Sequence, residues 1–186
     1  CHPEARADGI NWDTLSDGIG NFRNTKSLLN SHFTPPFLIS GTGEMAEDGI
    51  RGSFGNLVYA ALSEEDMNAV DEYLKSLVPV SSPYLNRDGT LTESAQRGRA
   101  LFEQRCIGCH SGPYFTDMKL HNEGGIKKGP IDEKIPFDTP TLVEVWRTGP
   151  WLYTGKHVTM PDALTSHVEL SLEPAELEDL SNYVLS

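Results

Sequence analysis

The sequence has few cysteines, few basic residues and no long apolar run. Its 186 residues include three cysteines, too few for a disulfide scaffold. Fifteen Lys and Arg residues stand against 27 Asp and Glu residues, for a formal net charge of −12. This charge argues against nucleic acid or an anionic membrane surface as a partner. No run of about 18 apolar residues occurs, so we expect no membrane span. The hydrophobic fraction of 38% fits a globular chain.

The segment 106–110 indicates the chemistry of the chain. Its residues, Cys106-Ile107-Gly108-Cys109-His110, form the C-x-x-C-H pattern of c-type haem attachment. Two thiols add across the vinyl groups of one haem edge, and the adjacent histidine supplies the proximal nitrogen to the iron. Two alternatives to haem attachment stay open for this segment. A zinc site would need a second ligand pair, and a thioredoxin-like redox pair is typical of a strand–helix junction.

Capping residues predict four helices. Thr92 is the expected N-cap of a helix that leads to Cys106, and Ser63 caps an amphipathic helix ending near Leu77. Pro174 suits the first position of a C-terminal helix. Thr159 caps a short helix on which Leu164, His167 and Val168 share one face.

The chain repeats itself at a spacing of 114 residues. Six identities fall within 17 positions: Thr25, Leu28, Thr34, Pro36, Leu38 and Gly41 align with Thr139, Leu142, Thr148, Pro150, Leu152 and Gly155. The helix at 63–77 also resembles that at 173–185. We therefore predict an all-α fold of two tandem c-type cytochrome-like helical domains with long loops. Their bounds are 1–77 and 92–186, joined by a turn-rich linker at 78–91.

The repeat also predicts a role for Cys1-His2. It matches Cys109-His110, so we expect it to be the end of a second C-x-x-C-H whose first half is missing. The first domain would then be truncated at its haem motif, and the chain would be a piece of a longer protein. A chance Cys-His pair is the alternative. The expected cofactor is accordingly one or two haem c groups.

Three stretches together resemble a known family. They are CIGCHSGPYFTDMKLHNEG at 106–124, FDTPTLVEVWRTGPWLYTG at 137–155 and RNTKSL at 23–28. They are similar to motifs of the bacterial di-haem cytochrome c peroxidase superfamily, including its amine-dehydrogenase-maturating relatives. The resemblance implies two helical haem domains face to face. It also implies a cytochrome-like domain of a larger bacterial surface protein, with a periplasmic or cell-surface location.

The resemblance further implies metal ligands. A calcium ion between the domains would be held by the side chain of Asn24 and the carbonyls of Thr148 and Pro150. Counting from the family motif places the sixth ligand of the second haem at His167, which the helix pattern favours independently. Met160 and His157 are the reserve candidates, and His121 is expected to be structural or to face a haem propionate.

The first haem would have His2 as its proximal ligand. The repeat equates His167 with Ser53, so no equivalent sixth ligand is present. His32, Met45 or an open iron position are the candidates.

Departures from the family motifs bear on catalysis. Tyr153-Thr154 stands where the family motif has a His-Asp pair before its glycine. Val143 stands where the family motif has an arginine. Peroxide cleavage needs an acid or base near the iron, so we favour an electron-transfer module. A peroxidase or oxidase with peroxide at the first haem is the alternative, and a degenerate structural domain is the third hypothesis; whether the chain is an enzyme stays open. The expected partner is a redox protein or a small electron donor, with a basic or neutral surface.

Overall fold

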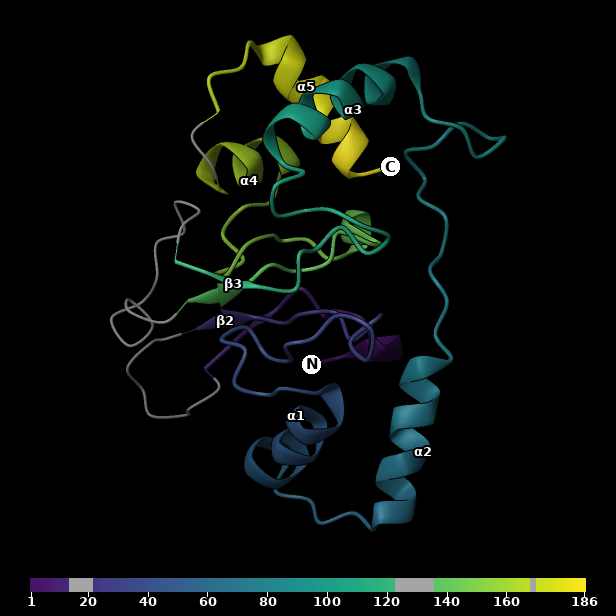
Figure 1. Cartoon of the computed structure of the whole chain (residues 1–186), viewed down its shortest axis with the longest axis vertical. Helices are drawn as coiled ribbons and strands as arrows, with labels where there is room; N and C mark the ends of the chain where they lie inside the picture. The colour runs from purple at the N-terminus through teal and green to yellow at the C-terminus, as the bar shows by residue number, and fades with distance from the viewer. Residues whose placement is uncertain (14–21, 123–135, 168–169) are drawn as a thin grey trace.

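The computed structural model describes residues 1–13, 22–122, 136–167 and 170–186. Figure 1 shows helices at both ends of the long axis, with loops and two small sheets between them. At one end lie α1 (Ala46–Ser53), η2 (Phe54–Val58) and α2 (Glu64–Lys75), and at the other lie α3 (Glu93–Arg105), α4 (Met160–His167) and α5 (Pro174–Val184). The short helices η1 (Pro3–Ala5) and η3 (Val145–Arg147) belong to the middle. Two antiparallel pairs join β1 (Asn11–Trp12) to β2 (Arg23–Asn24) and β3 (Leu120–His121) to β4 (Phe137–Asp138). The prediction of a mostly helical fold with long loops is confirmed.

The helices begin where the capping residues predict. Three hydroxyl oxygens accept the amide three residues on: Ser63 from Asp66 at 3.1 Å, Thr92 from Ala95 at 3.2 Å, and Thr159 from Asp162 at 3.3 Å. Pro174 is the first residue of α5. These bonds satisfy amides that the first helical turn leaves without partners. Val168, expected beside His167, lies outside the described residues.

Each helical end has its own apolar core. At the C-terminal end, buried residues of α3, α4 and α5 and the C-cap of α5 form one cluster: Phe102, Met160, Ala163, Leu164, Leu180 and Leu185. At the N-terminal end, residues of η1, α1 and α2 form another: Ala5, Ala46, Ile50, Met67 and Leu74. Helices α3 and α5 cross so closely at Gly98 that an added Cβ would lie 1.9 Å from the carbonyl oxygen of Asp179.

The segments that lead into α1 and α4 follow similar backbone courses, 114 residues apart. Leu38 and Leu152 both have left-handed backbones, with φ of 69° and 64°, and Gly41 and Gly155 follow with φ of 63° and 57°. An antiparallel bridge precedes each helix: Phe37 with Gly43, and Trp151 with His157. Helices α1 and α4 then begin and end at the same spacing.

A buried ion pair joins the N-terminal segment to the segment before η3. The Arg6 guanidinium donates to both carboxylate oxygens of Glu144, at 2.9 and 3.1 Å. Their side chains are 8% and 1% exposed. The linker is bound to the same pair, because Arg6 also donates to the Val78 carbonyl at 3.2 Å and the Val80 amide donates to Glu144 at 2.5 Å. Three distant segments therefore meet at one pair of charges.

Further contacts in the middle of the molecule connect early and late segments. The Lys26 ammonium lies 3.0 Å from the Asp138 carboxylate, and the Asp138 amide donates to the Ile39 carbonyl at 2.9 Å. The rings of Phe33 and Tyr114 stack with centroids 6.1 Å apart. Burial raises the pKa of Asp138 although Lys26 opposes this effect.

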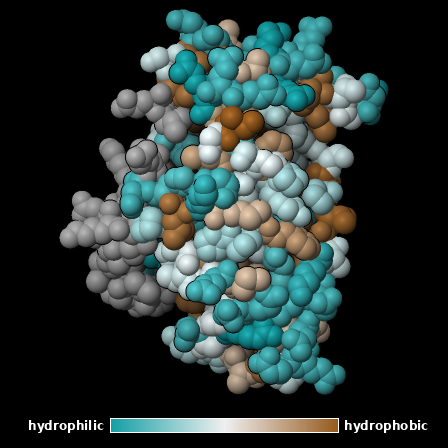
Figure 2. Space-filling view, in the orientation of Figure 1, coloured by the Kyte–Doolittle hydropathy of each residue, from teal (hydrophilic) through white to brown (hydrophobic). Residues whose placement is uncertain are grey.

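The surface carries hydrophobic side chains only in small patches on the face that Figure 2 shows, and hydrophilic residues cover both helical ends there. Among the helices described, none has both the length and the apolar character needed to cross a membrane.

We expect Glu144→Gln to destabilise the fold by about 3–5 kcal/mol, because the change leaves the buried Arg6 charge without its counter-charge. Burial alone would raise the pKa of Glu144, but hydrogen bonds from Arg6 and Val80 outweigh it and lower that pKa below 4.5. A lowered folded-state pKa stabilises above the unfolded value and is lost as the pH falls through the folded value. The stability gap between parent and variant should therefore close below pH 4.5, which chemical denaturation across pH measures.

The control is Glu103→Gln, which breaks the exposed Arg99–Glu103 pair of 2.8 Å. Such an exposed pair contributes little to stability, because water and salt screen its charges. Equal losses in the two variants would contradict the role given to Glu144.

We expect Gly98→Ala to destabilise the α3–α5 crossing by about 1–3 kcal/mol, because the methyl group meets backbone and not a flexible side chain. Thermal unfolding of the two proteins tests this. Gly55→Ala is the matched control, since nothing lies within 4 Å of an added Cβ there. A Gly98→Ala protein as stable as the parent would show that the helices separate without cost.

Candidate functional site

Helix α3 delivers the C-x-x-C-H segment to the site. Cys106 caps its C-terminus, and the Cys106 amide donates to the Phe102 carbonyl at 2.8 Å. The amides of Cys109 and His110 both turn back to the Cys106 carbonyl, at 3.2 and 2.9 Å. Both thiols are half-buried and reduced, and burial raises the pKa of Cys106. The tight turn presents two thiols and one imidazole on the segment that follows α3.

His110 is held in one orientation by the backbone. It is 8% exposed, and its Nδ1 lies 2.9 Å from the carbonyl oxygen of Phe115. This bond requires a proton on Nδ1, which leaves Nε2 with a lone pair for a metal. Burial is the main reason that the pKa of His110 lies below its ordinary value. The imidazole is therefore neutral near pH 7, as ligation needs.

His167, the last residue of α4, faces His110. The two ring centroids lie 6.1 Å apart, with ring planes at 63°. A metal bound at about 2 Å from each of two imidazole nitrogens would hold the ring centroids roughly 6 Å apart. The spacing thus fits an iron between the two rings, with Cys106 and Cys109 beside one of them. The residues present fit a c-type haem.

The reserve ligand candidates lie in other places. Met160 is buried at 4% exposure in the cluster formed by α3, α4 and α5. His157 is bridged to Trp151, and its Nδ1 lies 3.5 Å from the Ser166 hydroxyl.

His121 lies beside the second cysteine. Its Nε2 is 2.8 Å from the Asp117 carboxylate, and the ligand atoms of Cys109, Asp117 and His121 lie within 4.8 Å of one another. These three groups could hold a metal ion only while Cys109 is a free thiolate. Attachment of haem would use that sulfur, so the group belongs to the C-x-x-C-H site.

The predicted calcium residues Asn24 and Pro150 meet in the middle of the molecule. The Asn24 Nδ2 donates to the carbonyls of Pro150 at 2.5 Å and Leu152 at 3.4 Å. Its Oδ1 is buried and has no hydrogen-bond partner. The Thr148 hydroxyl donates to the Val145 carbonyl at 3.1 Å.

The N-terminal candidates do not share such a site. Cys1 and His2 are exposed, and Met45 is 49% exposed next to the start of α1. His32 is buried, but its Nε2 lies 3.1 Å from Asp71 and its Nδ1 lies 3.4 Å from the Ser31 hydroxyl.

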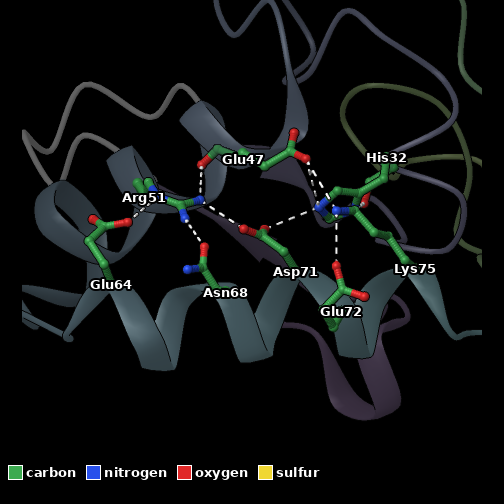
Figure 3. A network of polar contacts seen from close by, with 9 residues as sticks. His32, Glu47, Arg51, Glu64, Asn68, Asp71, Glu72 and Lys75 are labelled. Carbon is green, nitrogen blue, oxygen red and sulfur yellow. Dashed lines mark hydrogen bonds and ion pairs between the residues drawn. The ribbon is translucent and has the colours of Figure 1, made fainter.

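Figure 3 shows His32 within a network between α1 and α2. The Arg51 guanidinium donates to Asp71 at 2.9 Å, and Glu47 lies 3.6 Å from Lys75. Burial alone would raise the pKa of Asp71, but hydrogen bonds from Arg51 and His32 lower it. The Nε2 contact with Asp71 directs His32 toward this network, whereas its Nδ1 lies near the Ser31 hydroxyl.

Some site features carried no clear signal in the sequence. The Phe115 carbonyl orients His110 through a backbone atom, which no side-chain pattern reports. The Leu152 carbonyl joins that of Pro150 near Asn24 only because Leu152 takes a left-handed conformation. The ion pair of Arg6 and Glu144 joins residues 138 positions apart, a separation at which no local sequence pattern indicates a contact.

The cytochrome c family model matches residues 95–186. The chain is 26% identical to hydrazine synthase subunit gamma of Kuenenia stuttgartiensis, over 99% of this chain and 70% of that protein. It is 30% identical to the cytochrome-c peroxidase IdrP2 of Pseudomonas sp. (strain SCT), over 80% of this chain and 50% of that protein.

Solved structures share the fold. A Kuenenia stuttgartiensis hydrazine synthase structure superimposes with a TM-score of 0.82 at 22% identity, over 97% of this chain and 77% of that one. A MauG-like protein associated with microbial copper homeostasis gives a TM-score of 0.74 at 19% identity, over 99% and 79%.

Residues 95–186 are a cytochrome c domain. The chain as a whole fits the superfamily of bacterial di-haem cytochrome c peroxidases and their MauG-like relatives. The resemblance drawn from the three sequence stretches is confirmed. The chain spans about half the length of the IdrP2 peroxidase that it matches.

Proposed function

We propose that this chain is an electron-transfer module of the c-type cytochrome kind. In this proposal one haem c is attached to Cys106 and Cys109, and its iron lies between His110 and His167. The observation that carries the proposal is the separation of 6.1 Å between the two imidazole rings. A cytochrome c domain related to di-haem peroxidases is the setting in which such a pair is expected.

Haem supplies a one-electron redox couple when it is bound. The chain contributes the surroundings. The apolar cluster that includes Phe102 and Leu164 packs against Cys106, and the Phe115 carbonyl orients His110. Two protein ligands leave no open position for peroxide, which favours electron transfer over catalysis at this site.

We also propose that the chain contains two copies of one plan, at 1–77 and 92–186. Matching left-handed backbone positions, matching bridges and the equal lengths of α1 and α4 support this. A second haem at Cys1-His2 belongs to the proposal. Because thioether attachment is completed outside the bacterial cytoplasm, we expect a periplasmic or cell-surface location. The acidic charge of −12 favours a basic or neutral redox partner.

A peroxidase with its reaction at the N-terminal half is the second candidate. One observation favours it: Ser53 ends α1 where His167 ends α4, and its hydroxyl donates to the Gly49 carbonyl at 2.7 Å. Serine offers no imidazole, so an iron at that half would have an open position.

A calcium ion at Asn24 is the third part of the proposal. Rotating the Asn24 side-chain amide by half a turn would place Oδ1 where Nδ2 now lies. The oxygens of Asn24, Pro150 and Leu152 would then point toward one position, where a calcium ion could bind. Calcium prefers such oxygen ligands. The two carbonyls that already converge on the Asn24 side chain support this.

The spectrum of the protein made with the cytochrome c maturation machinery tests the haem site. We expect a low-spin c-type spectrum for the haem at His110. Replacing His167 by Ala should convert one haem equivalent to high spin and make it bind cyanide, because the sixth ligand is lost. Added imidazole should restore the low-spin spectrum.

His157→Ala is the control, since that imidazole lies near α4 but contacts Ser166. It should leave the spectrum unchanged. A His167→Ala protein with the parent spectrum would refute His167 as a ligand. A parent without covalent haem would favour the structural-domain hypothesis.

For calcium, we expect addition of the ion to chelator-treated protein to raise its Tm. A concentration of 100 times the Kd stabilises by about 2.7 kcal/mol. Asn24→Ala should abolish the rise. Asn86→Ala removes a similar amide bond, to the Leu91 carbonyl in the linker at 3.1 Å, and should keep the rise in Tm. A calcium response in Asn24→Ala would contradict the site.

A further inference from the structure

The peptide group between Phe115 and Thr116 is fastened at both of its polar atoms. Its carbonyl oxygen lies 2.9 Å from Nδ1 of His110, and its N–H donates to the Ser111 carbonyl at 2.9 Å. Both partners belong to the segment that begins at the C-x-x-C-H turn. Phe115 has a left-handed backbone with φ of 52°, a conformation that a non-glycine residue keeps only where its surroundings hold it.

Two threonines hold this backbone in place through hydrogen bonds between the segments 114–116 and 139–141. The Thr116 hydroxyl donates to the Thr139 carbonyl at 2.6 Å, and the Thr141 hydroxyl donates to the Tyr114 carbonyl at 2.7 Å. The two anchored residues, Tyr114 and Thr116, flank Phe115 on either side. Each hydroxyl also accepts a backbone amide two residues on: Met118 for Thr116 at 3.0 Å, and Val143 for Thr141 at 3.2 Å.

Burial makes these bonds hard to replace by water. Thr116 and Thr139 are 6% and 7% exposed. A buried carbonyl that loses its donor stays unsatisfied, so the segment would shift to find another partner. The movement would displace the Phe115 carbonyl, which is the acceptor for His110.

We propose that Thr116 and Thr141 are positioning residues for the axial ligand His110. They hold the Phe115 carbonyl against Nδ1 of the imidazole and so set how strongly His110 donates electrons to a bound iron. A ligating histidine whose other nitrogen donates to a carbonyl is a more basic ligand. The inference rests on the proposed haem site.

The hydrogen bond from Nδ1 of His110 to the Phe115 carbonyl favours the oxidised iron, because a more basic ligand stabilises the higher positive charge of the oxidised state. Weakening it should therefore raise the midpoint potential of the haem at His110. The test measures this potential by spectroelectrochemical titration in Thr116→Val, Thr141→Val and the double variant. Valine keeps the shape of threonine and removes only the hydroxyl. We expect an upward shift in each single variant and a larger one in the double variant.

Two sets of controls separate positioning from packing. Thr116→Ser and Thr141→Ser keep the hydroxyl and should restore the parent potential. Thr90→Val removes a hydroxyl bond to the Asp88 carboxylate, of 2.7 Å, in the turn before α3, at the opposite end of that helix from Cys106. It should leave the potential unchanged, even if thermal unfolding shows a loss of stability.

A potential equal to that of the parent in both valine variants would overturn the inference, whatever their stability. So would a shift in Thr90→Val as large as theirs. Thr141 is half-buried, so Thr141→Val decides the question if Thr116→Val does not fold. A parent protein that carries no covalent haem would refute the proposed function instead. The haem content of the parent is therefore measured before any variant is compared.

Discussion

The ion pair between Arg6 and Glu144 is the constraint on which the arrangement of the chain depends. Its charges are almost fully buried and come from the beginning of the chain and from the segment before η3. The linker binds to the same two side chains through Val78 and Val80. Buried charges are tolerated only where partners surround them. The pair therefore fixes the relative placement of the two helical ends and of the loops between them.

The candidate haem site is built on the same middle layer. Helix α3 brings the cysteines, helix α4 brings His167, and the loop around Phe115 orients His110. That loop is tied to the segment at 139–143, which follows the strand that contacts Ile39 in the N-terminal half. The ligand geometry thus depends on backbone contacts that reach across the molecule.

Helices α1 and α4 follow similar backbone segments, but their side chains differ. Ser53 stands at the end of α1 and His167 at the end of α4. Both pairs of helices share an apolar cluster, but α1 and α2 also hold the charged network around Asp71. Segments with similar backbones can accordingly carry different chemistry, because that chemistry depends on their side chains.

The sequence by itself determined the local features. The spacing of Cys106, Cys109 and His110 and the helix caps at Ser63 and Thr92 depend on residues only a few positions apart, and short-range geometry suffices for these. The predicted face of His167 followed from helical periodicity. Only the tertiary structure decided that His32 meets Asp71, that Arg6 meets Glu144, and that the Phe115 carbonyl meets His110. The first two depend on the packing of distant segments, and the third on a left-handed backbone that its neighbours impose.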